Sequence, residues 1–155
     1  MESHRRLGTK MGERSPASKT FSLIVHSTAP QKGKSMHLAH TMIRVRNLED
    51  SLEFYCNFLG LHEVRRKDIS DEATLVFLSD DAENYHLELT LNRDGRDYIL
   101  GDQFGHLAFH VDDLETVITE VKERNWWYRQ SKPTASSKYI FVHDPDGYDI
   151  EILQA

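Results

Sequence analysis

Two histidines and two glutamates recur in step along this chain of 155 residues. His40 and His106 each open an apolar segment that alternates like a strand. Glu88 and Glu151 each lie near the end of a later segment of the same kind, and the step between the glutamates nearly equals the step between the histidines. Two imidazole nitrogens and two carboxylate oxygens suit a divalent transition metal and leave coordination positions open for chemistry. The register therefore predicts that all four side chains are ligands of one metal ion.

The elements that carry these residues also repeat, in the order strand, helix, strand, strand, strand. In the first copy, residues 37–46 alternate as a strand, and Asn47 is placed to cap the helix that follows. Apolar residues at helical spacing continue to Leu59, and Gly60 supplies the end of the helix. Three further strands are predicted, at about residues 61–66, 73–79 and 85–92.

The second copy follows the same pattern. It opens with a strand at residues 106–111, and Asp113 caps its helix at the same spacing from the leading histidine as the first cap. Its later strands are predicted at about 126–130, 139–143 and 148–153, and the sequence DPDG at 144–147 is typical of a tight turn. The predicted fold class is α+β: two βαβββ modules, about 36–92 and 104–155, whose mixed sheets curl into a cup.

Strand alternation decides which side chains share a face with the predicted ligands. On the last strand of the first copy, Glu88 and Asn92 lie on one face, and the intervening leucines lie on the other. Arg44 shares the face of His40, further along the first strand. We expect the leucines to pack beneath the helix and the polar face to line a wet cup.

The charge of the chain is unevenly distributed. Residues 1–35 hold seven Lys or Arg and two Glu, a net charge of +5; the total is −6, so the remainder of the chain holds −11. The acidic body argues against nucleic-acid binding, which depends on neutralising phosphates. No apolar run is long enough to cross a membrane, so we expect no membrane span. The single cysteine, Cys56, excludes an internal disulfide and fits a reducing compartment, and we expect the cytoplasm.

Residues 1–35 mix Ser, Thr, Gly, Pro and basic side chains with little apolar periodicity. This composition predicts a disordered basic extension ahead of a folded domain at residues 36–155. An apolar island at 21–25 is too short for a secretory signal. Arg-rich, Ser-rich composition is also typical of organellar transit peptides, and that alternative stays open.

Several motifs together resemble the glyoxalase I family, the lactoylglutathione lyases of the vicinal-oxygen-chelate superfamily. The resemblance covers residues 36–155 and rests on HTMIRV at 40–45, SLEFY at 51–55, LG at 59–60, ELTLN at 88–92, GHLAF at 105–109 and DPDGYDIE at 144–151. In that family the positions matching the four predicted ligands bind the metal. The positions matching Arg44 and Asn92 hold the glutathione part of the substrate, and members of this size are homodimers. The resemblance thus implies that His40 and Glu88 meet the partner's His106 and the partner's Glu151.

The resemblance also implies an activity, the isomerisation of the methylglyoxal–glutathione hemithioacetal to S-lactoylglutathione in methylglyoxal detoxification. The reaction moves a proton between neighbouring carbons through an enediolate, which needs a cation and a carboxylate. Glu151 is implied as the principal base, with Glu88 as the carboxylate on the opposite side. The compact body resembles the nickel- or cobalt-using members more than the zinc-using ones, so nickel is expected, with cobalt and zinc as alternatives.

The loop before the penultimate strand departs from the family pattern. Residues 131–138 read SKPTASSK and lack the glycines that usually accompany a substrate-gripping lysine. Lys132 or Lys138 could take the place of that lysine.

Two other functions fit the same scaffold. An iron-dependent extradiol dioxygenase would use two histidines and one carboxylate, and Glu88 argues against it because a fourth anionic ligand would occupy space needed by oxygen chemistry. A non-catalytic dimer that binds a metal or a small molecule would keep the cup without turning over the hemithioacetal. Anaerobic iron reconstitution with a catechol tests the first, and metal binding without turnover would favour the second.

Overall fold

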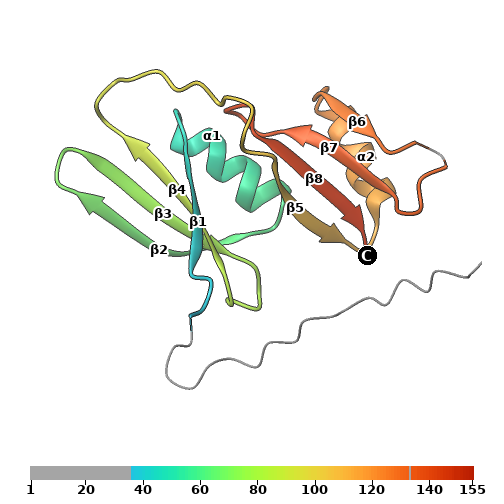
Figure 1. The fold of residues 1–155 in the computed structure, drawn as a ribbon, viewed down its shortest axis with the longest axis horizontal. Coiled ribbons are helices and arrows are strands. Elements are labelled where there is room, and N and C mark those ends of the chain that lie inside the picture. Colours follow the sequence, from blue (N-terminus) through green and yellow to red (C-terminus); the bar gives the residue numbers. More distant parts are fainter. Residues whose placement is uncertain (1–35, 133) are drawn as a thin grey trace, which may run out of the picture. The chain divides into compact units, whose positions relative to one another are not determined.

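The structure, a computed structural model, describes residues 36–132 and 134–155 (Figure 1). The predicted basic extension, residues 1–35, lies outside the described residues. None of the helices in the described part of the chain has both the length and the apolar character needed to cross a membrane.

The first sheet has four strands in the order β1-β4-β3-β2. These strands are β1 His40–Arg44, β2 His62–Ile69, β3 Ala73–Ser79 and β4 His86–Asn92. β1 and β4 run parallel, although they are the first and last strands of the module, and the other neighbours are antiparallel. The helix carries the chain from the end of β1 to β2 at the far edge of the sheet. The antiparallel strands β3 and β4 then lead back, so β4 lies beside β1 and parallel to it.

The second sheet repeats this topology in the order β5-β8-β7-β6. Its strands are β5 His106–Val111, β6 Tyr128–Gln130, β7 Tyr139–His143 and β8 Asp149–Gln154. β5 and β8 are the parallel neighbours. The predicted α+β class with two βαβββ repeats is confirmed, and the bounds of β3, β5 and β7 fall where the sequence predicts them.

The first helical segment begins as expected and then winds differently. Helix α1, Leu48–Leu52, is capped by Asn47, whose side chain accepts hydrogen bonds from the next backbone N–H groups, at 2.9 Å and 3.3 Å. The chain continues as the π-helix η1, Glu53–Phe58, where the Leu59 N–H donates to the Phe54 carbonyl at 3.0 Å. The expected continuous α-helical stripe is therefore wrong beyond residue 52. The wider winding lets two adjacent aromatic residues, Phe54 and Tyr55, both reach the core.

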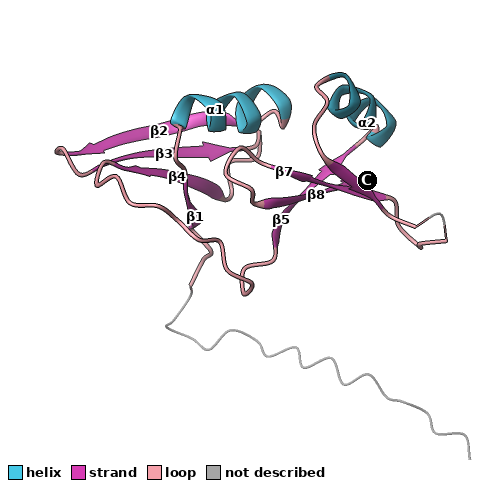
Figure 2. Ribbon diagram, turned by 90° about the horizontal axis from the view of Figure 1, so that it is seen from above, coloured by secondary structure: helices cyan, strands magenta, loops and turns pink. Residues whose placement is uncertain are grey.

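The second helix, α2 Leu114–Glu123, matches its prediction. Asp113 caps it with hydrogen bonds from the N–H groups of the first turn, and its buried face carries Leu114, Ile118 and Val121. Figure 2 shows that both helical segments cover the same side of the sheets. The apolar faces of the strands thus pack beneath helices, and the opposite faces of the sheets carry the predicted ligands.

The leucines of β4 follow the predicted alternation, but the polar face is drier than expected. Leu87 and Leu89 are buried in the core, as predicted. Glu88 and Thr90 on the other face are also buried, each with 7% of its surface exposed. Glu88 lies between the neighbouring strands, opposite Met42 on one side and Phe77 on the other.

A buried hydrogen bond joins the two modules. The Tyr55 hydroxyl of η1 donates to Asp144 Oδ2 at 2.8 Å, and both residues are buried. Asp144 Oδ1 accepts from the N–H groups of Asp146 and Tyr148 at 3.0 Å and 2.8 Å, which shapes the DPDG turn. Burial raises the pKa of Asp144, because desolvation disfavours the carboxylate, and burial likewise raises the pKa of Tyr55.

Substituting Tyr55→Phe should lower the free energy of unfolding by about 2 kcal/mol, because it leaves a buried carboxylate oxygen without its donor. Urea denaturation followed by circular dichroism measures the change. The matched control is Tyr128→Phe, a half-buried tyrosine on the edge strand β6 of the second sheet, which should stay close to wild type. Equal unfolding midpoints for the two variants would contradict the importance of this bond.

Candidate metal centre

The first predicted pair of ligands lies on neighbouring strands of the first sheet. His40 stands opposite His86 in the β1–β4 register, so Glu88 is two residues along β4 and on the same face. The His40 Nε2 atom lies 3.0 Å from Glu88 Oε2. The His40 side chain is 41% exposed and the Glu88 side chain 10%. The pair therefore offers a metal ion one nearly buried oxygen ligand and one accessible nitrogen ligand.

The second pair reproduces this geometry on the second sheet. His106 stands opposite Asp149 in the β5–β8 register, and Glu151 follows two residues along β8. The His106 Nε2 atom lies 3.1 Å from Glu151 Oε2. The imidazole is again 41% exposed, whereas the carboxylate is 17% exposed. The sequence register at residues 40, 88, 106 and 151 thus corresponds to two equivalent pairs of side chains in space.

An aromatic ring and a guanidinium group accompany each pair. In the first sheet, the His40 ring meets Phe77 edge-on at 5.6 Å, and Arg65 lies 3.9 Å from the Phe77 centroid. Arg65, Phe77 and Glu88 are neighbours in register across β2, β3 and β4. His40 also borders an open hollow of about 500 Å³, which Arg65 and Phe77 help to line.

The second sheet carries the same arrangement. The His106 ring meets Phe141 edge-on at 5.2 Å, and Arg129 lies 4.8 Å from the Phe141 centroid. Sequence reasoning missed these residues, although the two phenylalanines and the two arginines recur along the chain at one and the same interval. The edge contact limits rotation of each imidazole and so favours one orientation of Nε2.

The two pairs differ in how their carboxylates are held. Thr90 lies two residues after Glu88 and donates from Oγ1 to Glu88 Oε1 at 2.9 Å. Leu153 occupies the corresponding place after Glu151 and has no hydroxyl. Within the described residues, Oε1 of Glu151 receives no hydrogen bond. Glu88 is therefore fixed through both oxygens, whereas Glu151 is held through one.

The structure does not bring all four predicted ligands together within one chain. No group of three or more His, Cys, Asp or Glu side chains placed to hold a metal ion occurs among the described residues. Each pair supplies one nitrogen and one oxygen, which are suitable donors for a divalent transition metal but two fewer than a four-ligand site needs. Each sheet therefore carries half of the predicted site.

The residues expected to hold the substrate lie at the C-terminal ends of β1 and β4, beyond the His40–Glu88 pair. Asn92 is the last residue of β4, and its Nδ2 donates to the Tyr98 hydroxyl at 2.8 Å. The Arg44 guanidinium carbon lies 5.9 Å from the centroid of the same ring. Arg44 and Asn92 are thus brought together around Tyr98, a residue that sequence reasoning did not single out.

The remaining lysine candidates lie in the loop between β6 and β7. Lys132 and Lys138 are both exposed. The Lys138 carbonyl accepts from the Gln154 N–H at 3.0 Å, which ties the loop backbone to the end of β8. Among the described residues, no contact joins either lysine side chain to a His–Glu pair.

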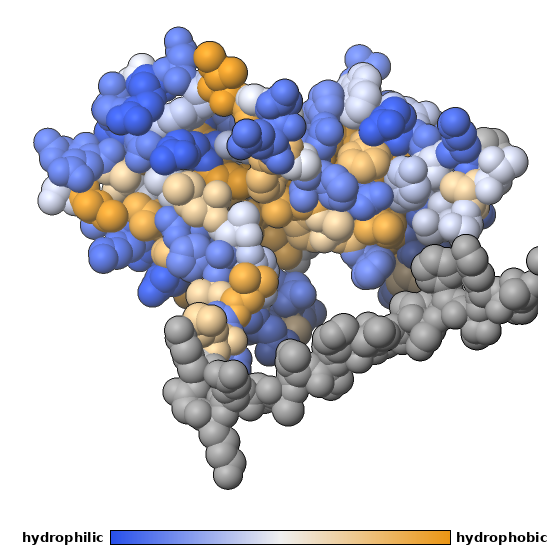
Figure 3. Space-filling view, in the orientation of Figure 1, coloured by the Kyte–Doolittle hydropathy of each residue, from blue (hydrophilic) through white to orange (hydrophobic). Residues whose placement is uncertain are grey.

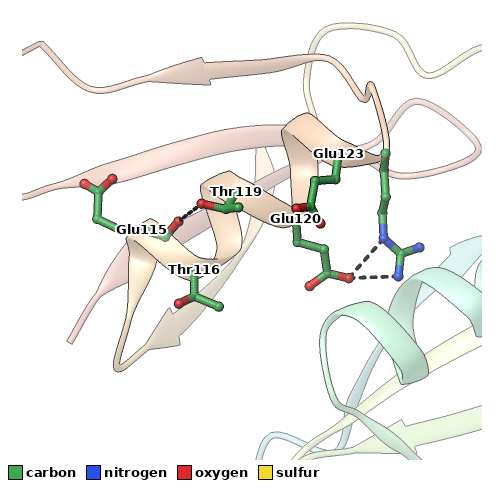
Figure 4. A pocket seen from close by; sticks show the side chains of 6 residues that line it. Glu115, Thr116, Thr119, Glu120 and Glu123 are labelled. Carbon is green, nitrogen blue, oxygen red and sulfur yellow. Dashed lines mark hydrogen bonds and ion pairs between the residues drawn. The ribbon is translucent and has the colours of Figure 1, made fainter.

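A separate depression lies over α2, and none of the residues that line it belongs to a His–Glu pair (Figure 4). Its lining residues are Glu115, Thr116, Thr119, Glu120, Glu123 and Arg124. Glu120 pairs with Arg124 at 2.8 Å, and the Thr119 hydroxyl donates to the Glu115 carbonyl at 2.9 Å. The depression holds no imidazole, so it lacks the mixed donor set of the candidate centre.

The model of the glyoxalase/bleomycin resistance protein/dioxygenase superfamily matches residues 37–152. The chain belongs to this family. A probable lactoylglutathione lyase of Synechocystis is 41% identical over 125 residues, which span 77% of this chain and 95% of the relative. A lactoylglutathione lyase of Neisseria meningitidis is 43% identical over 125 residues, which span 77% of this chain and 91% of the relative.

Solved structures show the same fold. A trypanothione-dependent glyoxalase I of Leishmania major superposes with a TM-score of 0.68 at 34% identity, over 77% of this chain and 87% of that chain. Glyoxalase I of Zea mays gives a TM-score of 0.68 at 27% identity, over 77% of this chain and 44% of that chain. The predicted membership of the glyoxalase I family and the predicted fold are confirmed.

Proposed function

We propose that this protein is a lactoylglutathione lyase, which isomerises the hemithioacetal of methylglyoxal and glutathione to S-lactoylglutathione. The observation that carries the proposal is the presence of two equivalent His–Glu pairs, one on each sheet of this family's fold. The Nε2–Oε2 distances in these pairs are 3.0 Å and 3.1 Å. Relatives that bear the name lactoylglutathione lyase match 77% of the chain at 41% and 43% identity. They support the enzyme over the extradiol dioxygenase and the non-catalytic dimer. The single cysteine supports a cytoplasmic location.

The donor set fits a divalent metal of the glyoxalase I type. Two carboxylates balance the charge of a dication, and together with two imidazoles they suit nickel, cobalt or zinc. We propose nickel. When bound, the metal would supply positive charge that holds two vicinal substrate oxygens and stabilises the negative charge that develops on them. His40 and His106 present their Nε2 atoms toward the carboxylates, so no large rearrangement within either half-site is needed for ligation.

A second copy of the chain would complete the centre. Each sheet carries one His–Glu pair with an exposed imidazole. The His40–Glu88 pair of one chain can therefore face the His106–Glu151 pair of a partner chain. Hydrophobic side chains gather across the middle of the face seen in Figure 3. The exposed hydrophobic residues include Leu38, Met42 and Phe104, each two positions from a predicted ligand histidine. Apolar surface beside a half-site favours a homodimer in which both subunits contribute to each centre.

The difference between the half-sites supports different roles for the two glutamates. Glu88 is buried and accepts the Thr90 hydroxyl, so it is suited to remain in place and to anchor the centre. Glu151 is more exposed and has one oxygen without a donor among the described residues. That oxygen can move and accept the substrate carbon-bound proton, and then return it to the neighbouring carbon. Glu151 is therefore the principal base, and Glu88 assists from the opposite side.

Arg44 and Asn92 supply the polar groups that hold the glutathione part. Arg44 is exposed on the ligand-bearing face of β1, where its planar guanidinium can bind a carboxylate through two hydrogen bonds. Asn92 uses its Nδ2 group on Tyr98, so its Oδ1 atom is the group oriented for substrate. Lys132 and Lys138 stay candidates for a further contact with the thiol cosubstrate.

The first test of the function is turnover after metal exchange. Chelator-treated protein should be inactive, and reloading with nickel, cobalt or zinc should restore conversion of the methylglyoxal–glutathione adduct, with nickel or cobalt most effective. Formation of the thioester is followed by absorbance. The trypanothione adduct is assayed in parallel, because the Leishmania relative is described as trypanothione-dependent. Metal uptake without turnover of either adduct would refute the enzyme and support a binding protein.

The shared centre predicts complementation between two inactive variants. Glu88→Gln and Glu151→Gln homodimers each have two defective centres. A mixed dimer has one centre with both substitutions and one with neither, so random pairing should restore about a quarter of wild-type activity. The variants are unfolded together, refolded and assayed, with each variant refolded alone as the control. A mixture no more active than its components would rule out centres shared between subunits.

The roles of the glutamates predict a specific kinetic loss. Glu151→Gln should lower kcat by about a hundredfold or more per bound metal ion, because an amide cannot accept the substrate proton. Metal content is measured by plasma mass spectrometry, so that loss of the base is separated from loss of a ligand. The matched control is Glu123→Gln on α2, the helix that covers the opposite side of the second sheet from the His106–Glu151 pair, which should keep full activity (Figure 2). Near-normal kcat in metal-loaded Glu151→Gln would exclude the role as base.

A further inference from the structure

Tyr98 is the one half-buried residue in an exposed stretch of the linker between the modules, residues 93–100. Its hydroxyl accepts a hydrogen bond from Asn92 Nδ2 at 2.8 Å. Because the amide nitrogen is engaged, the hydrogen bond fixes which end of the Asn92 side chain is turned away from the protein. The linker thus contributes a contact that sets the orientation of a proposed substrate-binding group.

The Tyr98 ring also lies close to two cations. The guanidinium carbons of Arg44 and Arg46 lie 5.9 Å and 6.0 Å from its centroid. Arg44 and Arg46 extend from the same side of the chain at the end of β1, and the aromatic face offers each of them an electrostatic attraction. An arginine side chain that is held before substrate arrives loses less conformational entropy on binding.

The backbone at Tyr98 is held by Arg46, and Arg46 is held in turn by the second module. Arg46 Nη2 donates to the Tyr98 carbonyl at 2.7 Å. Arg46 also binds Asp146 of the DPDG turn, through its Nη1 atom at 3.0 Å and its backbone N–H at 3.1 Å. The Asp146 side chain is only 5% exposed, so this ion pair is shielded from solvent on the carboxylate side. Tyr98 therefore has a defined position although it belongs to a linker.

We propose that Tyr98 is a positioning residue that orients Arg44 and Asn92 for the glutathione part of the substrate. The proposal rests on the proposed function, since it assigns a role within the same binding site. Tyr98 acts through its neighbours: the hydroxyl orients the Asn92 amide, and the ring restrains the Arg44 guanidinium. It therefore strengthens substrate binding and leaves the proton transfer at Glu151 unchanged.

The test compares Tyr98→Phe and Tyr98→Leu in the metal-loaded full chain. Tyr98→Phe keeps the ring and loses the hydrogen bond, so KM for the methylglyoxal–glutathione adduct should rise about fivefold. Tyr98→Leu loses both contacts, so KM should rise about tenfold or more. In both variants kcat should stay within about twofold of wild type, because the missing contacts act on binding. Tyr128→Phe is the matched control and should leave both constants unchanged.

Direct binding separates positioning from a general loss of stability. The Kd of S-methylglutathione, measured by calorimetry, should rise in parallel with KM, whereas the thermal unfolding midpoint of Tyr98→Phe should change little. Adding Tyr98→Phe to an Asn92→Ala variant should produce no further rise in KM, because the hydroxyl acts through the amide that is already gone.

The outcomes distinguish this inference from the proposed function. Wild-type protein that neither binds S-methylglutathione nor turns over the adduct would refute the glutathione-dependent function itself. Wild-type protein that does both, together with a Tyr98→Phe variant of equal KM and Kd, would overturn the role of Tyr98 alone. A fall in kcat with unchanged KM, or a fully additive effect in the Asn92→Ala background, would also overturn it.

Discussion

The parallel pairing of the first and last strands of each module is the constraint on which the candidate centre depends. β1 lies beside β4 and β5 lies beside β8, although the paired strands are far apart in sequence. In each pair the glutamate is two residues beyond the partner of the histidine, so both side chains emerge on one face. A register shift of one residue would place the glutamate among the leucines under the helix. The two distances, 3.0 Å and 3.1 Å, follow from this shared register.

The same constraint explains why one chain carries two halves and no complete centre among its described residues. Each couple is confined to its own sheet, and the helices occupy the opposite faces (Figure 2). The Tyr55–Asp144 hydrogen bond and the Arg46–Asp146 ion pair join the modules through the first helical segment, the end of β1 and the DPDG turn. These contacts connect the modules without bringing the two His–Glu pairs together.

Much of the fold could be predicted from the sequence because its signals are local. Period-two alternation located the strands, and Asn47 and Asp113 marked the helix starts through side chains that satisfy free N–H groups. The π-winding after Leu52 could not be predicted, since it depends on packing two adjacent aromatic residues against the rest of the core. The drier environment of Glu88 was missed for a similar reason, because it depends on which residues lie opposite on neighbouring strands.

The candidate site was predictable where it repeats and unpredictable where the repeats differ. The four ligand positions recur at nearly constant intervals, so the two copies of the sequence served as a comparison for each other. Thr90 has no counterpart, since Leu153 stands in its place, and Tyr98 belongs to a linker that occurs once. These differences leave the Glu88 carboxylate with contacts through both oxygens and the Glu151 carboxylate with a contact through one. If the proposed centre forms, a symmetric pair of carboxylates would give a proton no preferred acceptor, whereas the absence of a hydroxyl two residues after Glu151 would favour that carboxylate as the acceptor.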